Sequence, residues 1–541
     1  MTYLITLITA MVISMAIIPV MARLAPRLGM VDRPDPRKVH TVPVPRAGGV
    51  GIVLGALVPM LLWLPMDDLI EAYLFGSLVL LVFGAWDDIC ELGHYVKFIG
   101  QFIAVLAVVY YGDLYVTHMP FLGAETLPES VGRPFTVFAM IGVINALNHS
   151  DGLDGLAGGM SLLSLACIAY LAYMADGTQA MFVVSATLGG ILGFLRFNTH
   201  PAKVFMGDGG SQFLGFTLAF LAVYLIERVN PALSPALPAL FLGLPVIDII
   251  AVFTQRIYHG MNWFRASKNH VHHRLLELGF DHYEAVVVKY SVQAIFVVCA
   301  VLLSYESDLL ILAIYLGISA ILFMFLTVAE HRGWKAHAKR KSVGLLRFVG
   351  AIKGHRLFSL VPLHYVAVAI SLLFVTVSAM AGEVPHDLAI VSAILAAMLI
   401  VFLLIGRDNE SIVVRTAYYV AAALIVYLDT KFFGAQIQAL GVVKAVYYVL
   451  LAVAIGFSIR YASRPGFKTT PMDYLVFFLM VLTGVTLHNL PEKQDIGYMA
   501  VKLIILFYGL ELVMTNIKKI WNVLNISVLA SLLLLTVRGF I

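Results

Sequence analysis

The sequence has few charged residues and very few cysteines, and both shortages limit what kind of protein it encodes. Only 13% of its 541 residues are charged, against about a quarter in an average soluble domain. Hydrophobic residues make up 61% of the chain, which excludes an ordinary soluble protein and a disordered one. Three cysteines, an odd number spread over apolar stretches, give no disulfide framework and no paired metal-binding motif. This composition indicates a protein that crosses a membrane many times.

Apolar stretches long enough to cross a bilayer recur along the whole chain, since a helix of about 20 apolar residues spans the hydrocarbon core. The first stretch lacks a basic segment before it and a small-residue cleavage site after it, so we expect a retained span and not a signal peptide. We predict an all-α polytopic membrane protein with about 18 transmembrane helices. The expected spans are residues 3–22, 48–66, 70–85, 98–112, 134–149, 157–175, 180–197, 212–229, 236–257, 286–304, 309–328, 359–381, 388–406, 414–430, 439–459, 472–490, 497–515 and 520–537.

The distribution of positive charge predicts how these spans are oriented. With the N-terminus outside, most Lys and Arg residues fall in the loops on the inner side, which is the usual bias of cytoplasmic loops. We therefore expect an N-terminus outside a bacterial inner (cytoplasmic) membrane, in contact with its lipid bilayer. The net charge of +4, from 36 Lys and Arg against 32 Asp and Glu, gives no basic surface for nucleic acid.

A basic loop divides the chain into two hydrophobic parts. We predict a first transmembrane domain over residues 1–330, a basic cytoplasmic loop over 331–358, and a C-terminal transmembrane region over 359–541. The last region has no motif that suggests chemistry, and we expect it to support a homo-oligomer or to bind downstream glycan enzymes. Its Lys444, Lys502 and Glu511 are expected to pair or to reach the membrane surface.

Carboxylates gather in the inner loops of the first part. Asp87 and Asp88 are adjacent at the end of a span, where they repel each other and need a cation, a positive substrate or a shared proton. In the next such loop, Asn148, Asp151 and Asp154 are three residues apart, which places their side chains on one face of a helical turn. A solvated helix end and a polar turn between packed helices are the simpler interpretations.

A third inner loop combines a carboxylate with glycines. Asp208 lies in the sequence GDGGS at 207–211, just before a span. Backbone N–H groups at such a helix start suit phosphate. A carboxylate there suits Mg²⁺ (or Mn²⁺), which proteins usually hold with one or two carboxylates plus substrate phosphates.

Cationic side chains on the same side complete the pattern. His270, His272, His273 and Arg274 form one cluster, and Arg46 precedes two glycines in another loop. A zinc site needs three or four converging ligands, whereas adjacent histidines point in different directions, so phosphate binding is favoured over zinc or a plain interfacial turn. Together these loops predict a divalent cation, a nucleotide-activated donor and a lipid acceptor at the cytoplasmic face.

Five motifs resemble, in order, spacing and side, those of the polyprenyl-phosphate N-acetylhexosamine-1-phosphate transferases, whose superfamily includes the phospho-MurNAc-pentapeptide transferases. The resemblance covers roughly residues 1–330. The motifs are DRPDPRKVHTVPVPRAGG at 32–49, DD at 87–88, NHSDGLDGLAGG at 148–159, FMGDGGS at 205–211 and HVHHRLLELG at 270–279.

The resemblance implies a role for each matching residue. Asp208 is implied as the Mg²⁺ ligand, with Asp87 and Asp88 serving the metal or the lipid phosphate. Phe205 is implied to pack on uracil, with Asp154 near the base. The expected catalytic residues are Asp87, Asp88, Asp151 and Asp208; the expected metal ligands are Asp208 and Asp87; and the expected substrate-binding residues are Arg46, Asn148, Asp154, Phe205, His270, His272, His273 and Arg274.

The implied reaction is a Mg²⁺-dependent transfer of N-acetylhexosamine-1-phosphate from a UDP-sugar donor to polyprenyl (undecaprenyl) phosphate. UMP leaves, and the lipid-linked sugar starts a cell-envelope glycan. The sequences PRAGG at 45–49 and HVHH at 270–273 differ from the motifs usual in the peptidoglycan branch. This difference favours a UDP-N-acetylhexosamine donor over UDP-MurNAc-pentapeptide. A UDP-MurNAc-pentapeptide transferase and a multi-span lipid or glycan transporter or flippase are the alternatives.

Overall fold

The computed structural model contains two compact units. The first comprises Met1–Ala338 with Thr470–Leu482, and the second comprises Lys339–Thr469 with Thr483–Ile541. The predicted division into a transmembrane domain, a basic cytoplasmic loop and a C-terminal transmembrane region, with the role expected of each, stays a prediction. The structure describes residues 2–34, 42–119, 126–261, 269–337, 356–381, 384–404, 412–431, 438–461, 474–476, 478–479, 482–483, 494–516 and 521–540.

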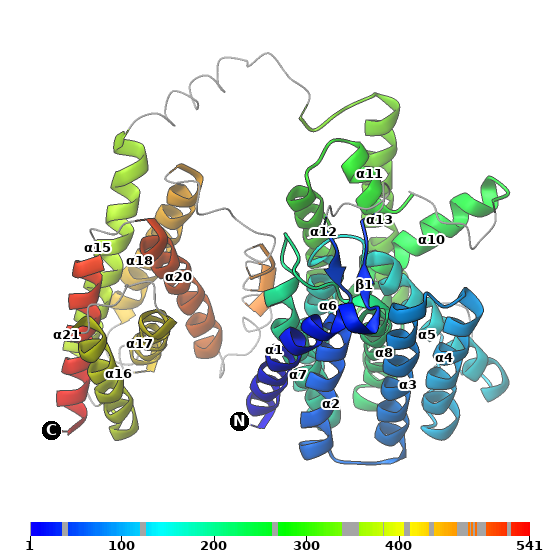
Figure 1. Cartoon of the computed structure of the whole chain (residues 1–541), viewed down its shortest axis with the longest axis horizontal. Helices are drawn as coiled ribbons and strands as arrows, with labels where there is room; N and C mark the ends of the chain where they lie inside the picture. The colour runs from blue at the N-terminus through cyan, green and yellow to red at the C-terminus, as the bar shows by residue number, and fades with distance from the viewer. Residues whose placement is uncertain are drawn as a thin grey trace. The chain divides into compact units, whose positions relative to one another are not determined.

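The first unit is a bundle of helices with one small β-ribbon (Figure 1). Strands β1 (Val31–Asp32) and β2 (Val44–Pro45) are antiparallel. Helices α4 and α8 continue into π-helical turns at Ala107–Tyr111 and Leu225–Val229. The helices are α1 (Thr2–Leu28), α2 (Gly48–Trp63), α3 (Asp68–Cys90), α4 (His94–Leu106), α5 (Glu129–Ser150), α6 (Leu156–Met174), α7 (Thr178–Asn198), α8 (Gly207–Tyr224), α9 (Leu237–Phe241), α10 (Gly243–Tyr258), α11 (Val271–Glu277), α12 (His282–Leu302) and α13 (Asp308–His331).

Long apolar helices dominate the described part of the chain. Within it, eleven helices are long and apolar enough to cross a membrane, and shorter apolar helices accompany them. The chain is therefore an all-α polytopic membrane protein, as its composition predicts. The count of 18 spans and the orientation stay predictions, and the expected span over 472–490 lies mostly outside the described residues.

Helix α8 forms the centre of the first unit and is buried along its length. Helix α3 packs directly against α8, because a Cβ on Gly84 would lie only 2.2 Å from the Cα of Gly209. Only glycine allows two helix backbones to approach so closely. This contact places Asp87 and Asp88, near the end of α3, beside Asp208 at the start of α8.

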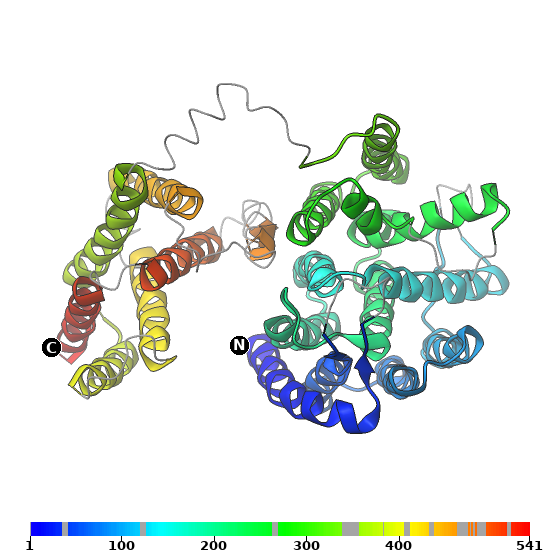
Figure 2. The same ribbon diagram turned by 45° about the horizontal axis from the view of Figure 1, so that its top comes forward.

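One expected span is broken, which corrects the prediction of a single helix over 236–257. The chain forms α9 and α10 instead, and the outer end of α10 projects from the bundle in Figure 1; Figure 2 gives a second view of the same helices. The Gln293 side chain donates to the Phe241 carbonyl at 2.9 Å and accepts from the Leu244 N–H at 3.0 Å. A break among apolar side chains is tolerated where the freed backbone groups find such partners.

The second unit has its own apolar core, which includes Phe374, Tyr418 and Leu510. Its helices pack through apolar side chains, as the hydropathy of the sequence predicts. Those in the described residues are α15 (Arg356–Met380), α16 (His386–Leu404), α17 (Ile412–Lys431), α18 (Gln438–Tyr461), α20 (Gln494–Asn516) and α21 (Trp521–Phe540).

A charged cluster lies inside the second unit. The Asp429 carboxylate on α17 is 2.9 Å from Lys444 Nζ on α18 and 2.7 Å from Lys502 Nζ on α20, and its side chain is only 2% exposed. Glu511 accepts a hydrogen bond from the Tyr419 hydroxyl at 2.5 Å. Of the two alternatives for Lys444 and Lys502, the structure shows pairing, with Asp429, a residue that the sequence analysis did not select; Asp429 thus ties three helices together.

We expect Asp429→Ala to lower the free energy of unfolding of the second unit by about 3 kcal/mol, because it leaves two partly buried ammonium groups without their carboxylate. Denaturant titration in detergent, followed by a fluorescent label in this unit, measures the change. Thr376→Val is the control, since Thr376 is exposed and donates only to its own helix. An Asp429→Ala protein as stable as this control would contradict the structural role of the cluster.

Candidate active site

One cavity in the first unit, of about 680 Å³, is lined by most of the predicted site residues. It lies where α3, α5 and α7 end and where α2, α4, α6, α8 and α12 begin, so the positive ends of several helix dipoles face it. Such an arrangement favours anions. The predicted residues that line the cavity are Arg46, Asp87, Asp88, Asn148, Asp151, Asp154, Phe205, Asp208, His272 and His273.

A lysine that the sequence analysis did not select occupies the centre of the carboxylates. The ammonium of Lys97 on α4 is 2.7 Å from an Asp87 oxygen and 2.6 Å from an Asp208 oxygen. Two carboxylates this close to one another need a cation between them. The geometry therefore marks a position for positive charge shared by α3 and α8.

Asp88 has a different arrangement from its neighbour Asp87. Its oxygens accept from the backbone N–H of Asp208 at 3.0 Å and face that of Gly209 at 3.5 Å, so it caps the start of α8. Gly207 has a φ of +71°, and a Cβ there would lie 2.5 Å from an Asp88 oxygen. Only glycine fits this turn, and the result is a fixed position for Asp208.

The loop after α5 adds two polar groups to this centre. Asn148 donates to an Asp208 oxygen at 3.2 Å and to the Ser211 hydroxyl at 2.8 Å, which fixes the orientation of the Asp208 carboxylate. Burial, followed by the charges of Asp208 and Asp154, raises the pKa of Asp151 to about 7. A carboxylate with such a pKa is fully ionised at neutral pH only when a cation is near, so this loop also suits a cationic partner.

Arg46 reaches the opposite wall from the segment between β2 and α2. Its guanidinium forms an ion pair with Asp32 and lies 3.7 Å from Glu91. Burial alone would lower the pKa of Arg46, but Asp32, helped by Asp88 and Glu91, raises it above its ordinary value. Arg46 thus stays charged beside the cavity, where it can meet a phosphate. The cationic residues Arg37, Lys38 and His40, which precede Arg46 in the motif at 32–49, lie outside the described residues.

The histidine motif is divided between two surroundings. His272 and His273 line the cavity, whereas His270 and Arg274 do not. Helix α11 turns Arg274 toward α13, where it makes two hydrogen bonds of 2.7 Å to Glu330. The guanidinium of Arg274 thus has a carboxylate partner outside the cavity lining, and its expected role in substrate binding stays a prediction.

Buried charges hold this motif in place. His270 Nδ1 is 3.6 Å from Asp248, whose other oxygen is 3.5 Å from the buried Lys289 ammonium. Asp248 also accepts from the Val271 N–H at 3.0 Å, at the start of α11. His270 thus lies next to the cavity lining and contacts Asp248, and its expected role in substrate binding stays a prediction. Burial, followed by the Lys289 charge, holds the pKa of His272 well below its usual range, so its ring is neutral.

Several residues that line the cavity were not predicted as site residues, among them Lys97, His200 and His282. In the sequence, Lys97 is only a single basic residue in an inner loop, shortly after the Asp87–Asp88 pair. His200 lies seven residues before the glycine at position 207, and His282 lies four residues before the expected span over 286–304. Their proximity is set by helix packing, which spacing along the chain does not reveal.

The chain is similar to a known family and to proteins of several bacteria. The model of "Glycosyl transferase family 4" matches residues 70–226. A probable undecaprenyl-phosphate N-acetylglucosaminyl 1-phosphate transferase of Bacillus subtilis is 32% identical over 333 residues, which cover 61% of this chain and 91% of the relative. The chain belongs to the family of polyprenyl-phosphate N-acetylglucosaminyl-1-phosphate transferases. The resemblance found in the sequence motifs is thereby confirmed.

Two other members of the transferase family show the same pattern of coverage. An undecaprenyl-phosphate α-N-acetylglucosaminyl 1-phosphate transferase of Haemophilus influenzae is 30% identical, over 60% of this chain and 94% of its own. A decaprenyl-phosphate N-acetylglucosaminephosphotransferase of Mycobacterium leprae is 32% identical, over 52% of this chain and 79% of its own. Each of these transferases thus matches only part of this longer chain.

We expect Lys97→Met to tighten Mg²⁺ binding several-fold, because the ammonium and a divalent cation compete for the same carboxylates. The Mg²⁺-dependent rise in melting temperature of the purified transferase, titrated with the ion, measures the affinity. Lys203→Met, which removes an exposed ammonium near the same cavity, is the matched control. Weaker Mg²⁺ binding in Lys97→Met would show that the lysine and the metal do not share one position.

Proposed function

We propose that the chain transfers N-acetylglucosamine-1-phosphate from UDP-N-acetylglucosamine to undecaprenyl phosphate. UMP leaves, and the polyprenyl-diphosphate sugar starts a cell-envelope glycan. The relatives' names supply the sugar and the lipid acceptor, and the uridine donor comes from the motif resemblance. The proposed place is the cytoplasmic side of the bacterial inner membrane.

The convergence of Asp87 and Asp208 on one cation carries this proposal. A transfer between two phosphate groups crowds several negative charges, and the site must neutralise them. The described cavity offers a carboxylate pair for a cation, helix starts for phosphates and Arg46 on its wall. A transporter has no need for such a centre at the ends of its helices.

Mg²⁺ (or Mn²⁺) fits the oxygen donors of this centre. Asp208 and Asp87 would hold the ion, with Asn148 orienting Asp208 through the 3.2 Å hydrogen bond. When bound, the ion supplies charge neutralisation for the transferring phosphoryl group. With the ion on these carboxylates, the Lys97 ammonium would be available for the phosphates of the donor.

The reaction forms a bond between a lipid phosphate oxygen and the β-phosphorus of the donor. The bond from that phosphorus to the bridging oxygen breaks, and UMP takes the electron pair. A phosphate monoester has a second pKa near 6, so at neutral pH the lipid phosphate is already mostly dianionic and needs no strong base. Since Asp88 already accepts from the α8 backbone, we assign it to orient Asp208 and not to remove a proton.

The donor is proposed to bind along the cavity from Phe205 to the histidines. Phe205 offers a ring for the uracil base, with Asp154 beside it. Neutral His272 donates a hydrogen bond to the diphosphate or the sugar, and His273 lines the same wall. Arg46 completes the contact with the phosphates.

We expect Asp208→Asn to lower kcat at least about a hundredfold, the usual loss when one electrostatic partner of a transition state is removed. Purified full-length protein is given undecaprenyl phosphate, Mg²⁺ and each UDP-N-acetylhexosamine in turn, and UMP and lipid-linked sugar are measured. Asp68→Asn, an exposed carboxylate at the other end of α3, is the control and keeps full activity.

Folded wild-type protein that transfers no sugar from any of these donors would contradict the proposed reaction. Turnover with UDP-MurNAc-pentapeptide alone would move the chain to the peptidoglycan branch. Asp208→Asn as active as Asp68→Asn would show that the cation position is not part of the reaction.

We expect the chain shortened to residues 1–338 to keep its turnover within a few-fold, because every residue of the cavity lies in this part. The Haemophilus influenzae relative aligns over 94% of its own length, and this alignment covers only 60% of the chain. Transfer by the shortened protein, compared with the full chain in the same detergent, is the measurement. A folded shortened protein with no activity would assign a catalytic contribution to the C-terminal region.

A further inference from the structure

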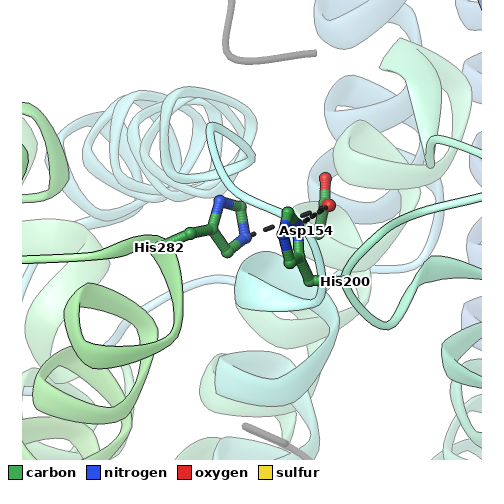
Figure 3. Close-up of side chains that lie close together, drawn as sticks. All are labelled: Asp154, His200 and His282. Carbon is green, nitrogen blue, oxygen red and sulfur yellow. Dashed lines mark hydrogen bonds and ion pairs between the residues drawn. The ribbon is translucent and has the colours of Figure 1, made fainter. Parts of the chain in front are cut away.

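Three side chains in the cavity converge apart from the Asp87–Asp208 centre. Figure 3 shows that Asp154, His200 and His282 point toward one another from three different segments. His200 Nδ1 is 2.6 Å from an Asp154 oxygen, and His282 Nε2 is 4.0 Å from the same oxygen. One potential ligand atom from each residue lies within 4.8 Å of the other two.

His282 is the member of this group that most needs a partner. Its side chain is 10% exposed, and both its ring nitrogens are buried without a hydrogen-bond partner. Leaving a buried polar group without a hydrogen-bond partner is energetically costly, so proteins rarely do it without a reason. The His282 ring stacks on His200, with centroids 4.0 Å apart, and its Nε2 is directed toward Asp154.

We propose that Asp154, His200 and His282 bind a late first-row divalent cation such as Zn²⁺. Two imidazoles and one carboxylate are a ligand set typical of these metals, whereas Mg²⁺ prefers oxygen alone. Ligands at about 2.0–2.1 Å from a tetrahedral Zn²⁺ lie about 3.3 Å from each other. The present separations from the Asp154 oxygen, 2.6 Å and 4.0 Å, bracket that value.

The surroundings of the group support a built site. The same Asp154 oxygen accepts from the Ala202 N–H at 3.0 Å, a contact of the kind that orients a ligating carboxylate. Three protein ligands leave one position of a tetrahedral ion open, and all three residues line the cavity. The ion would join the loop after α5, the loop after α7 and the start of α12. It shares no ligand with the Asp87–Asp208 centre, and the proposal does not rest on the transferase reaction.

Co²⁺ is the probe, because it replaces Zn²⁺ and its tetrahedral complexes absorb visible light. Tag-free full-length protein in detergent is titrated with Co²⁺ in excess Mg²⁺, without donor or lipid. We expect one equivalent of Co²⁺ with tetrahedral absorption bands, a higher melting temperature, and displacement of the bands by Zn²⁺. Asp208→Asn is expected to give the same spectrum, because Asp208 belongs to the other centre.

His282→Ala and His200→Ala are expected to weaken Co²⁺ binding at least about tenfold, the loss that even an outer partner of a metal site causes. His337→Ala is the matched control, since it removes an imidazole from an exposed group with Asp281 and Glu284. Should His282→Ala not fold, His282→Gln keeps the bulk of the ring. Folded wild type without a stoichiometric Co²⁺ spectrum, or an undiminished spectrum in a folded His282 variant, would overturn the proposal.

Discussion

The close contact between α3 and α8 is the constraint on which the site depends. Gly84 and Gly209 let two helix backbones meet, and this brings the end of one helix to the start of the other. Asp87 and Asp208 then face each other across the contact, with Lys97 between them. Carboxylates at the end of a membrane helix are costly unless paired, so the position for a cation follows from the packing itself.

The two units arrange their charged side chains with opposite ratios of ammonium groups to carboxylates. In the first, one ammonium lies between two carboxylates, which leaves negative charge for a metal ion to neutralise. In the second, two ammonium groups share the carboxylate of Asp429 inside an apolar core. The first arrangement opens onto a cavity and suits exchange of cations, whereas the second is enclosed and suits cohesion of helices.

Much of the fold and of the site is readable from the sequence, because both depend on strong local patterns. Long apolar runs predict the helices, and polar motifs between them predict most of the cavity. The break between α9 and α10 was not predictable, since its freed backbone groups are satisfied by Gln293 from another helix. Lys97 and His282 were missed for the same reason: the contacts of Lys97 with Asp208 and of His282 with Asp154 join residues far apart in the sequence.

Arg274 shows why a motif does not assign a role to each of its residues. A helix places successive side chains on different faces, so His272 and His273 can face the cavity only if Arg274 faces elsewhere. It meets Glu330 on α13, while His270 meets Asp248 and its partner Lys289. These buried pairs fix the angle of α11, and that angle presents two histidines to the cavity. Supporting residues of this kind are as necessary to the site as the residues that line the cavity, because α11 without them could not hold two histidine rings at fixed positions.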